Sequence, residues 1–170
     1  MKNYDSILLL LQKLNILYTE IEHTESHTCE ESKSLRDAAG LTGAGSKNIV
    51  FHAKGKFYLV ITLAEKSIKA RNFKHEFGTK DIRFASQEEI TPILDAIIGS
   101  IPPFGFPSEE IPVFVDAEIF DNEYFIFNPS VPTKSIRIAT RDLKRVYDSL
   151  KNPVKYFRES EEGFEVGRGD

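Results

Sequence analysis

The chain has 170 residues, of which 41% are hydrophobic and 28% charged, and its formal net charge is −4. These totals are ordinary for a globular protein with one core, and no apolar run approaches the roughly 18 residues that a membrane span requires. Cys29 is the only cysteine and no secretory signal pattern is recognisable, so we expect a cytoplasmic protein without disulfides or membrane contact.

Hydrophobic periodicity and capping signals predict helices and strands in irregular alternation. The helix starting at residue 28 and the one starting at residue 86 each begin with a capping box. Hairpin turns are expected at Lys54-Gly55-Lys56 and at Asp121-Asn122, and residues 42–46 are expected to form a loop. In chain order, the pattern predicts helix 6–14, strand 17–23, helix 28–39, strands 48–53 and 57–63, helix 67–77, strand 82–85, helix 86–98, strands 111–116, 124–127 and 135–139, and helix 140–150.

This order of elements predicts the fold class. Strict alternation of strand and helix is absent, so an all-parallel doubly wound sheet is not expected. The prediction is an α+β (mixed α/β) fold with a curved mixed sheet of about seven strands and helices packed against it. Residues 1–157 are expected to form one domain. The acidic segment 158–170 has little to bury and is expected to be a mobile tail.

Charge is distributed in blocks along the sequence. Residues 46–83 carry nine basic and three acidic side chains, and residues 133–157 carry seven and two. The segment between them, 84–132, carries nine acidic side chains and no basic one. The basic blocks either meet in space as one positive face for a nucleic acid, or are the solvated faces of separate helices, which is the more common arrangement.

The most distinctive local sequence is residues 99–105, Gly-Ser-Ile-Pro-Pro-Phe-Gly. Proline fixes φ and has no N–H, whereas glycine adopts backbone conformations closed to other residues, so the segment predicts a stiff, irregular loop. Such a loop can hold backbone amides at fixed positions toward a ligand. A purely structural turn fits the loop alone about equally well.

Three polar residues at strand ends are further candidates. Lys47 and Asn48 follow a glycine-containing segment and lead a strand, where an ammonium can reach a phosphate. Asn128 precedes Pro129 at the exit of another strand, where its amide can donate and accept hydrogen bonds. On position alone, a solvated lysine and an Asn-Pro turn are the more common interpretations.

Other chemistries have weaker support in the sequence. His23 and His27 are four residues apart but lie in a strand-to-loop region, and His52 and His75 are isolated, so no metal site is predicted. No Gly-x-Ser-x-Gly elbow and no phosphate loop of the usual spacing occur. An isolated cysteine such as Cys29 is more often inert than nucleophilic.

In their order and spacing, several of these segments resemble the YbaK/prolyl-tRNA-synthetase-associated editing domain family, over about residues 15–150. The similarity is greatest to its free-standing prolyl-tRNA deacylase branch. The segments that carry the resemblance are Glu22-His23-Thr24, Thr28-Cys29-Glu30-Glu31, Lys47-Asn48, Phe84-Ala85-Ser86, the loop from Gly99 to Gly105, Val113 to Asp116, and Asn128-Pro129 with Thr133.

The resemblance implies hydrolysis of the ester that joins a mischarged amino acid to the 3′ end of tRNA, most often alanine on tRNA for proline. It implies no side-chain nucleophile and no cofactor: water is activated with help from the terminal ribose hydroxyl, while loop amides hold the carbonyl. The catalytic residues implied are Lys47, Gly99 and Pro103. The substrate-binding residues implied are Asn48, Ser100, Ile101, Pro102, Phe104, Gly105 and Asn128. The implied partners are the acceptor end of aminoacyl-tRNA and, in addition, prolyl-tRNA synthetase.

Two positions depart from the pattern of that branch. Asn128 stands where histidine is frequent, and Pro132 stands where an asparagine is carried. Asparagine cannot carry a proton, so the first change removes any acid–base contribution there. The departures bear on amino-acid specificity more than on reaction type. Two other hypotheses stay open: an editing fold that binds tRNA or a synthetase without turnover, and, with least support, a metal-dependent hydrolase. The editing hypothesis requires Lys47 and the amides of loop 99–105 to meet at one cavity.

Overall fold

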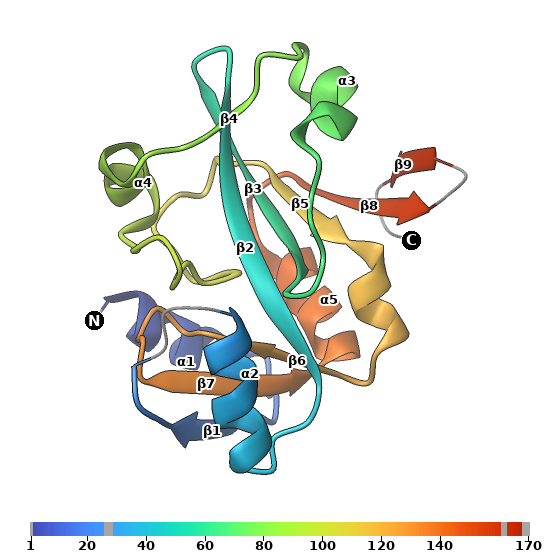
Figure 1. Cartoon of the computed structure of the whole chain (residues 1–170). Coiled ribbons are helices and arrows are strands. Elements are labelled where there is room, and N and C mark those ends of the chain that lie inside the picture. Colours follow the sequence, from blue (N-terminus) through green and yellow to red (C-terminus); the bar gives the residue numbers. More distant parts are fainter. Residues whose placement is uncertain (1, 26–28, 161–162, 168–170) are drawn as a thin grey trace.

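The computed structural model describes residues 2–25, 29–160 and 163–167. In these ranges nine strands form one mixed sheet in the order β1-β7-β6-β2-β3-β5-β8-β9, with β4 paired to β2 (Figure 1). The strands are β1 (Thr19–Glu22), β2 (Ala44–Ala53), β3 (Lys56–Leu63), β4 (Arg83–Phe84), β5 (Val113–Asp116), β6 (Tyr124–Phe127), β7 (Lys134–Ala139), β8 (Val154–Ser160) and β9 (Gly163–Gly167).

Strand β2 joins the two parts of the sheet. Its first residues, Ala44 and Gly45, pair in parallel with β6, and its whole remaining length pairs antiparallel with β3. Near its end, Phe51 and His52 also pair with β4. The tight turn between β2 and β3 has positive φ at both central residues, as a two-residue hairpin of primed type requires. The hairpin predicted at Lys54-Gly55-Lys56 is therefore confirmed.

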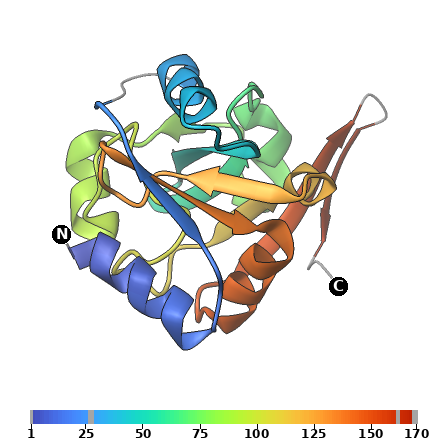
Figure 2. The same cartoon turned by 90° about the horizontal axis from the view of Figure 1, so that it is seen from below.

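Helices cover both faces of the sheet. Helices α1 (Lys2–Lys13) and α5 (Thr140–Ser149) lie together on one side, and α2 (Cys29–Ala38) lies on the other (Figure 2). The shorter helices are η1 (Ala70–Phe73), α3 (Lys74–Phe77), α4 (Gln87–Leu94) and η2 (Ala117–Asp121). None of the helices in the described ranges has the length and apolar character that crossing a membrane demands.

Helical spacing explains why α1 and α5 pack where they do. Ile7 and Leu11 of α1 are four residues apart, so both face the sheet and both are fully buried. Leu143, Val146 and Tyr147 form the corresponding face of α5. These side chains belong to one large apolar cluster, while a second cluster, rich in phenylalanine, lies under α3 and β8.

The predicted fold class is confirmed, with nine strands in place of about seven. Strand β6 has the predicted bounds, and the capping box of α4 is present, with Ser86 and Glu89 each bonding the other's backbone N–H. The capping box expected at Thr28 lies outside the described residues. These predictions were confirmed because the conformation of each segment depends mainly on its own residues.

Several predicted boundaries were wrong, and tertiary contacts explain why. Residues 44–46 belong to β2 rather than to a loop, because Ala44 and Gly45 pair with β6. The Asp121-Asn122 hairpin does not form: η2 connects β5 to β6, and β5 pairs in parallel with β3 and β8. The predicted helix 67–77 is only η1 and α3, and the helix from Ser86 ends at Leu94, where Asp95 adopts a left-handed conformation.

In its described part, the segment predicted to be a mobile tail forms a hairpin. Strand β8 runs to Ser160 and pairs antiparallel with β9. Phe157 is buried, and Phe164 of β9 lies with its ring centroid 5.6 Å from that of Phe157 and 5.0 Å from that of Phe73. The acidic composition concealed one apolar face, and that face gives the hairpin a surface to bury.

Gly105 offers a test of the packing between α1 and loop 99–105. Its φ is 85°, and a Cβ there would collide with Ile7 Cγ1. Gly55 has a similar φ of 73° but open space around it. We expect Gly105→Ala to lower the free energy of unfolding by about 1–3 kcal/mol more than Gly55→Ala, because overpacking adds to backbone strain. Urea unfolding of both variants measures this. Equal losses would contradict the packing argument.

Candidate functional site

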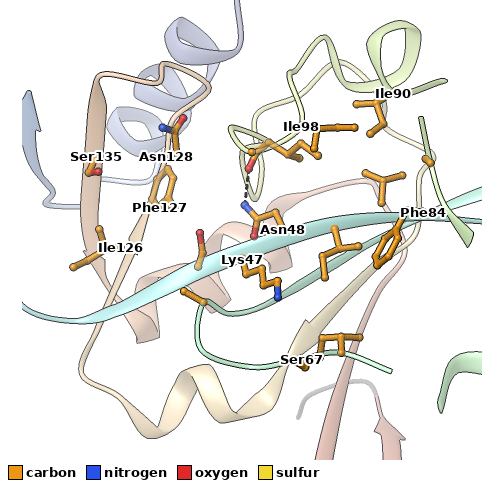
Figure 3. A pocket seen from close by; sticks show the side chains of 18 of the residues that line it. Lys47, Asn48, Ser67, Phe84, Ile90, Ile98, Ile126, Phe127, Asn128 and Ser135 are labelled. Carbon is orange, nitrogen blue, oxygen red and sulfur yellow. Dashed lines mark hydrogen bonds between the residues drawn. The ribbon is translucent and has the colours of Figure 1, made fainter. Parts of the chain in front are cut away.

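A cavity of about 490 Å³ lies at an interruption in the sheet. β2 pairs with β6 at Ala44 and Gly45 and with β4 at Phe51 and His52, so residues 46–50 between them have no strand partner on that edge. All five of these residues line the cavity (Figure 3). The other lining residues are Arg36, Ala64, Ser67, Ile68, Phe84, Ala85, Ile90, Ile98, Gly99, Ile101, Ile126, Phe127, Asn128 and Ser135.

Lys47 and Asn48 project from opposite sides of β2, as strand alternation requires (Figure 3). The Lys47 ammonium donates a hydrogen bond of 3.0 Å to the Lys66 carbonyl. One acceptor uses one of the three N–H groups of an ammonium, which leaves donors for a ligand. Lys47 is therefore held in place without being neutralised by a carboxylate within the described part of the chain.

The carbonyl that holds Lys47 belongs to a residue that is itself anchored. The Lys66 ammonium lies 2.7 Å from the carboxylate of Asp116, which is fully buried and also accepts a hydrogen bond from Thr62. Burial acts to lower the pKa of Lys66, but the hydrogen bond and charge of Asp116 outweigh it and the pKa is raised. This pair fixes the segment that carries the Lys66 carbonyl.

The first half of loop 99–105 faces the cavity. Gly99 has a φ of 95°, which favours glycine, and Asn48 Nδ2 donates to the Ile101 carbonyl at 2.6 Å. The Ser100 N–H is used within the loop, where it donates to the Ile97 carbonyl at 2.8 Å. Among the described residues, the N–H groups of Gly99 and Ile101 have no internal acceptor. Both residues line the cavity, so their amides are the donors that this part of the loop can present to a ligand.

The second half of the loop is an anchor in the core. Phe104 is fully buried, with its ring centroid 5.1 Å from that of Phe127, and the Tyr147 hydroxyl donates to the Pro103 carbonyl at 2.9 Å. The predicted site residues therefore separate into two sets. Lys47, Asn48, Gly99, Ile101 and Asn128 line the cavity. Those that do not line it are Ser100, Pro102, Pro103, Phe104 and Gly105.

Sequence reasoning missed two kinds of cavity residue. Arg36 of α2 is buried and packs its guanidinium against Gly45, where a Cβ would collide with it. Phe84 and Ile98 form an apolar rim, with 67% and 53% of their surface exposed. The Phe84 ring is stacked on the ring of buried Phe51, with 5.3 Å between the ring centroids. Buried arginine and exposed phenylalanine carry no local sequence signal, although Phe84 lies in a segment that resembled the family.

Ion pairs within the fold reduce the positive charge that the two basic blocks present. Lys66, Arg83, Lys134 and Lys155 each form an ion pair with a carboxylate. The blocks are thus partly neutralised within the fold. Nowhere in the described ranges do three or more His, Cys, Asp or Glu side chains form a group that could hold a metal ion.

Fold and cavity together define the class of protein. A solved structure described as a candidate trans-editing enzyme for prolyl-tRNA synthetase superposes with a TM-score of 0.72, over 99% of both chains at 16% identity. The family model of the aminoacyl-tRNA editing domain matches residues 23–146. The chain belongs to this family, which confirms the resemblance inferred from its motifs.

Two named relatives show which editing proteins the chain is similar to. It is 23% identical over 154 residues to the prolyl-tRNA editing protein ProX of Acetoanaerobium sticklandii, covering 88% of this chain and 93% of that protein. It is 32% identical over 103 residues to the proline–tRNA ligase of Staphylococcus saprophyticus, covering 61% of this chain and 18% of the ligase. The similarity to the ligase is thus confined to a part of that enzyme.

Glu89 offers a pH test of how the rim is held. Arg83, which directly precedes the rim residue Phe84, donates to both Glu89 oxygens at 2.7 and 2.8 Å. The hydrogen bond from Arg83, and then that from the Ser86 backbone, lower the pKa of Glu89 from 4.5 to about 2. Because folding lowers this pKa, the ionised Glu89 carboxylate stabilises the fold above pH 4.5. This contribution is lost as the pH falls toward about 2.

We therefore expect Glu89→Gln to be less stable than the parent chain near neutral pH, with a difference that shrinks as the solution is acidified below pH 4.5. Urea unfolding of both proteins across this range measures the difference. A difference that does not change with pH would show that the ion pair is not its cause.

Proposed function

We propose that this protein is a trans-editing deacylase that hydrolyses the ester of mischarged aminoacyl-tRNA, with Ala-tRNA(Pro) as the expected substrate. The observation that supports the proposal is that Lys47 lines one cavity with Gly99 and Ile101, whose amides have no internal acceptor among the described residues. The similarity to a named prolyl-tRNA editing protein over most of both chains supports the choice of tRNA.

The proposed reaction needs no side-chain nucleophile. Water, activated with help from the terminal ribose hydroxyl, attacks the ester carbonyl. The carbon–oxygen bond to the ribose breaks, and a proton passes to the ribose oxygen. The N–H groups of Gly99 and Ile101 stabilise the oxyanion, since fixed donors in a partly dry site cost no reorganisation during the reaction. The Lys47 ammonium holds the terminal phosphate or the ester end in register.

The apolar rim suits the last base of the tRNA. Phe84 is supported from beneath by Phe51 and is largely exposed. An exposed, rigid aromatic ring is a platform on which a base can stack whatever its sequence. In this arrangement the terminal adenine stacks on Phe84 while the aminoacyl group enters the cavity.

Lys47→Ala tests the proposed catalytic site. Loss of one fixed charged group is expected to slow single-turnover deacylation of Ala-tRNA(Pro) by about 10²–10³-fold, the range found for single stabilising donors. Lys56→Ala, at an exposed position of the β2–β3 hairpin, serves as the control and should react at the parent rate. Full activity of Lys47→Ala would refute the assignment. Binding of tRNA without turnover by the parent chain would favour the non-catalytic hypothesis instead.

Phe84→Leu tests the stacking platform. Removing the ring is expected to weaken binding of a tRNA acceptor-stem duplex by about tenfold, within the range for one base–aromatic stack, and Phe84→Trp should restore it. A fluorescent 2-aminopurine in place of the terminal adenine reports stacking directly through its quenching. Unchanged quenching in Phe84→Leu would show that the base lies elsewhere.

A further inference from the structure

The cavity contains two buried amide oxygens without a hydrogen-bond donor. These are Oδ1 of Asn48 and Oδ1 of Asn128, both inaccessible to solvent and without a partner in the described part of the chain. The Asn48 orientation is fixed, because its Nδ2 donates to the Ile101 carbonyl and a reversed amide would place two acceptors together. Buried acceptors left unpaired cost free energy, so a site that keeps them is suited to a ligand with donors.

Ser135 adds a third acceptor to the same wall. Its position follows from the register of β6 and β7, in which Phe127 pairs with Ile136, so that Asn128 stands opposite Ser135. Residues directly opposite in an antiparallel pair project to the same side of the sheet. Both of these residues line the cavity.

The hydroxyl of Ser135 is turned away from the cavity by His23. Nδ1 of His23 lies 2.7 Å from the Thr24 carbonyl, which can only accept, so in the neutral form of the ring the proton is on Nδ1. Nε2 is then an acceptor, and Ser135 Oγ, 2.9 Å away, donates its proton to it. Ser135 Oγ therefore offers only lone pairs to a ligand.

We propose that the acceptor oxygens of Asn48, Asn128 and Ser135 bind the α-ammonium group of the aminoacyl ester. The inference rests on the proposed function and deepens it: the substrate class is an aminoacyl-tRNA with a free α-amino group. A primary ammonium has three N–H donors and no acceptor, which matches three acceptors on the wall. An N-blocked aminoacyl group keeps one N–H and loses its charge, so it can make at most one of these hydrogen bonds.

The test compares Ala-tRNA(Pro) with N-acetyl-Ala-tRNA(Pro) in single-turnover deacylation. The parent chain is expected to hydrolyse the free-amine substrate at least about tenfold faster, since hydrogen bonds to a charged group are lost on acetylation. Asn128→Leu, similar in volume but without an acceptor, should lose most of this preference. Asn128→Asp keeps an acceptor oxygen and should retain it. A purely structural role for Asn128 would leave the ratio of the two rates unchanged in both variants.

The outcomes separate this inference from the proposed function. Equal rates on both substrates would overturn the ammonium wall and leave the deacylase proposal standing. Hydrolysis of neither substrate would overturn the deacylase proposal. In that case the experiment uses a non-hydrolysable acceptor-stem analogue that carries alanine through an amide at its 3′ end. The affinity of the protein for this analogue is measured with and without an N-acetyl group on the alanine. Tighter binding of the free amine would support the wall, and equal affinity would overturn it.

Discussion

The hydrogen bond from Asn48 to the Ile101 carbonyl holds the candidate site together. It connects residues 53 positions apart in the sequence at a distance of 2.6 Å. The loop has a second fixed point, because Tyr147 bonds the Pro103 carbonyl and Phe104 is buried in the core. Gly99 and Ile101, the two loop residues that line the cavity, keep amides that lack an internal acceptor among the described residues. The same hydrogen bond also turns Asn48 Oδ1 away from the loop.

An interruption of the sheet makes room for a ligand in this fold. β2 is bonded to β6 at its start and to β4 near its end, and the residues between border the cavity. Backbone groups and side chains of a single strand thus become accessible from one edge. The cost of an unpaired strand edge is moderate here, because the edge faces a cavity shielded by α4, the loop and β6 rather than open solvent.

Lys47 and Asn128 are held in position by different parts of the structure. Lys47 depends on a carbonyl whose own residue is fixed by a salt bridge to buried Asp116. Asn128 depends on the register of β6 and β7, which places it opposite Ser135. A neutral amide where the deacylase branch often carries histidine keeps an acceptor oxygen at any pH at which the protein is folded.

The sequence by itself determined the features that depend on local chemistry. The β2–β3 turn, the capping box of α4, the bounds of β6 and the need for glycine at residues 99 and 105 could all be predicted from nearby residues. The motifs also named Lys47, Asn48, Gly99, Ile101 and Asn128, which the fold brings to one cavity.

Only the tertiary structure decided which loop residues face the cavity and which are buried, because proline and phenylalanine serve equally well in either place. It also decided the pairing of Ala44 with β6, the burial of Arg36 and the hairpin formed by β8 and β9. Each of these depends on contacts between segments far apart in the sequence. Their free energy comes from burial against a distant surface, which no local pattern encodes.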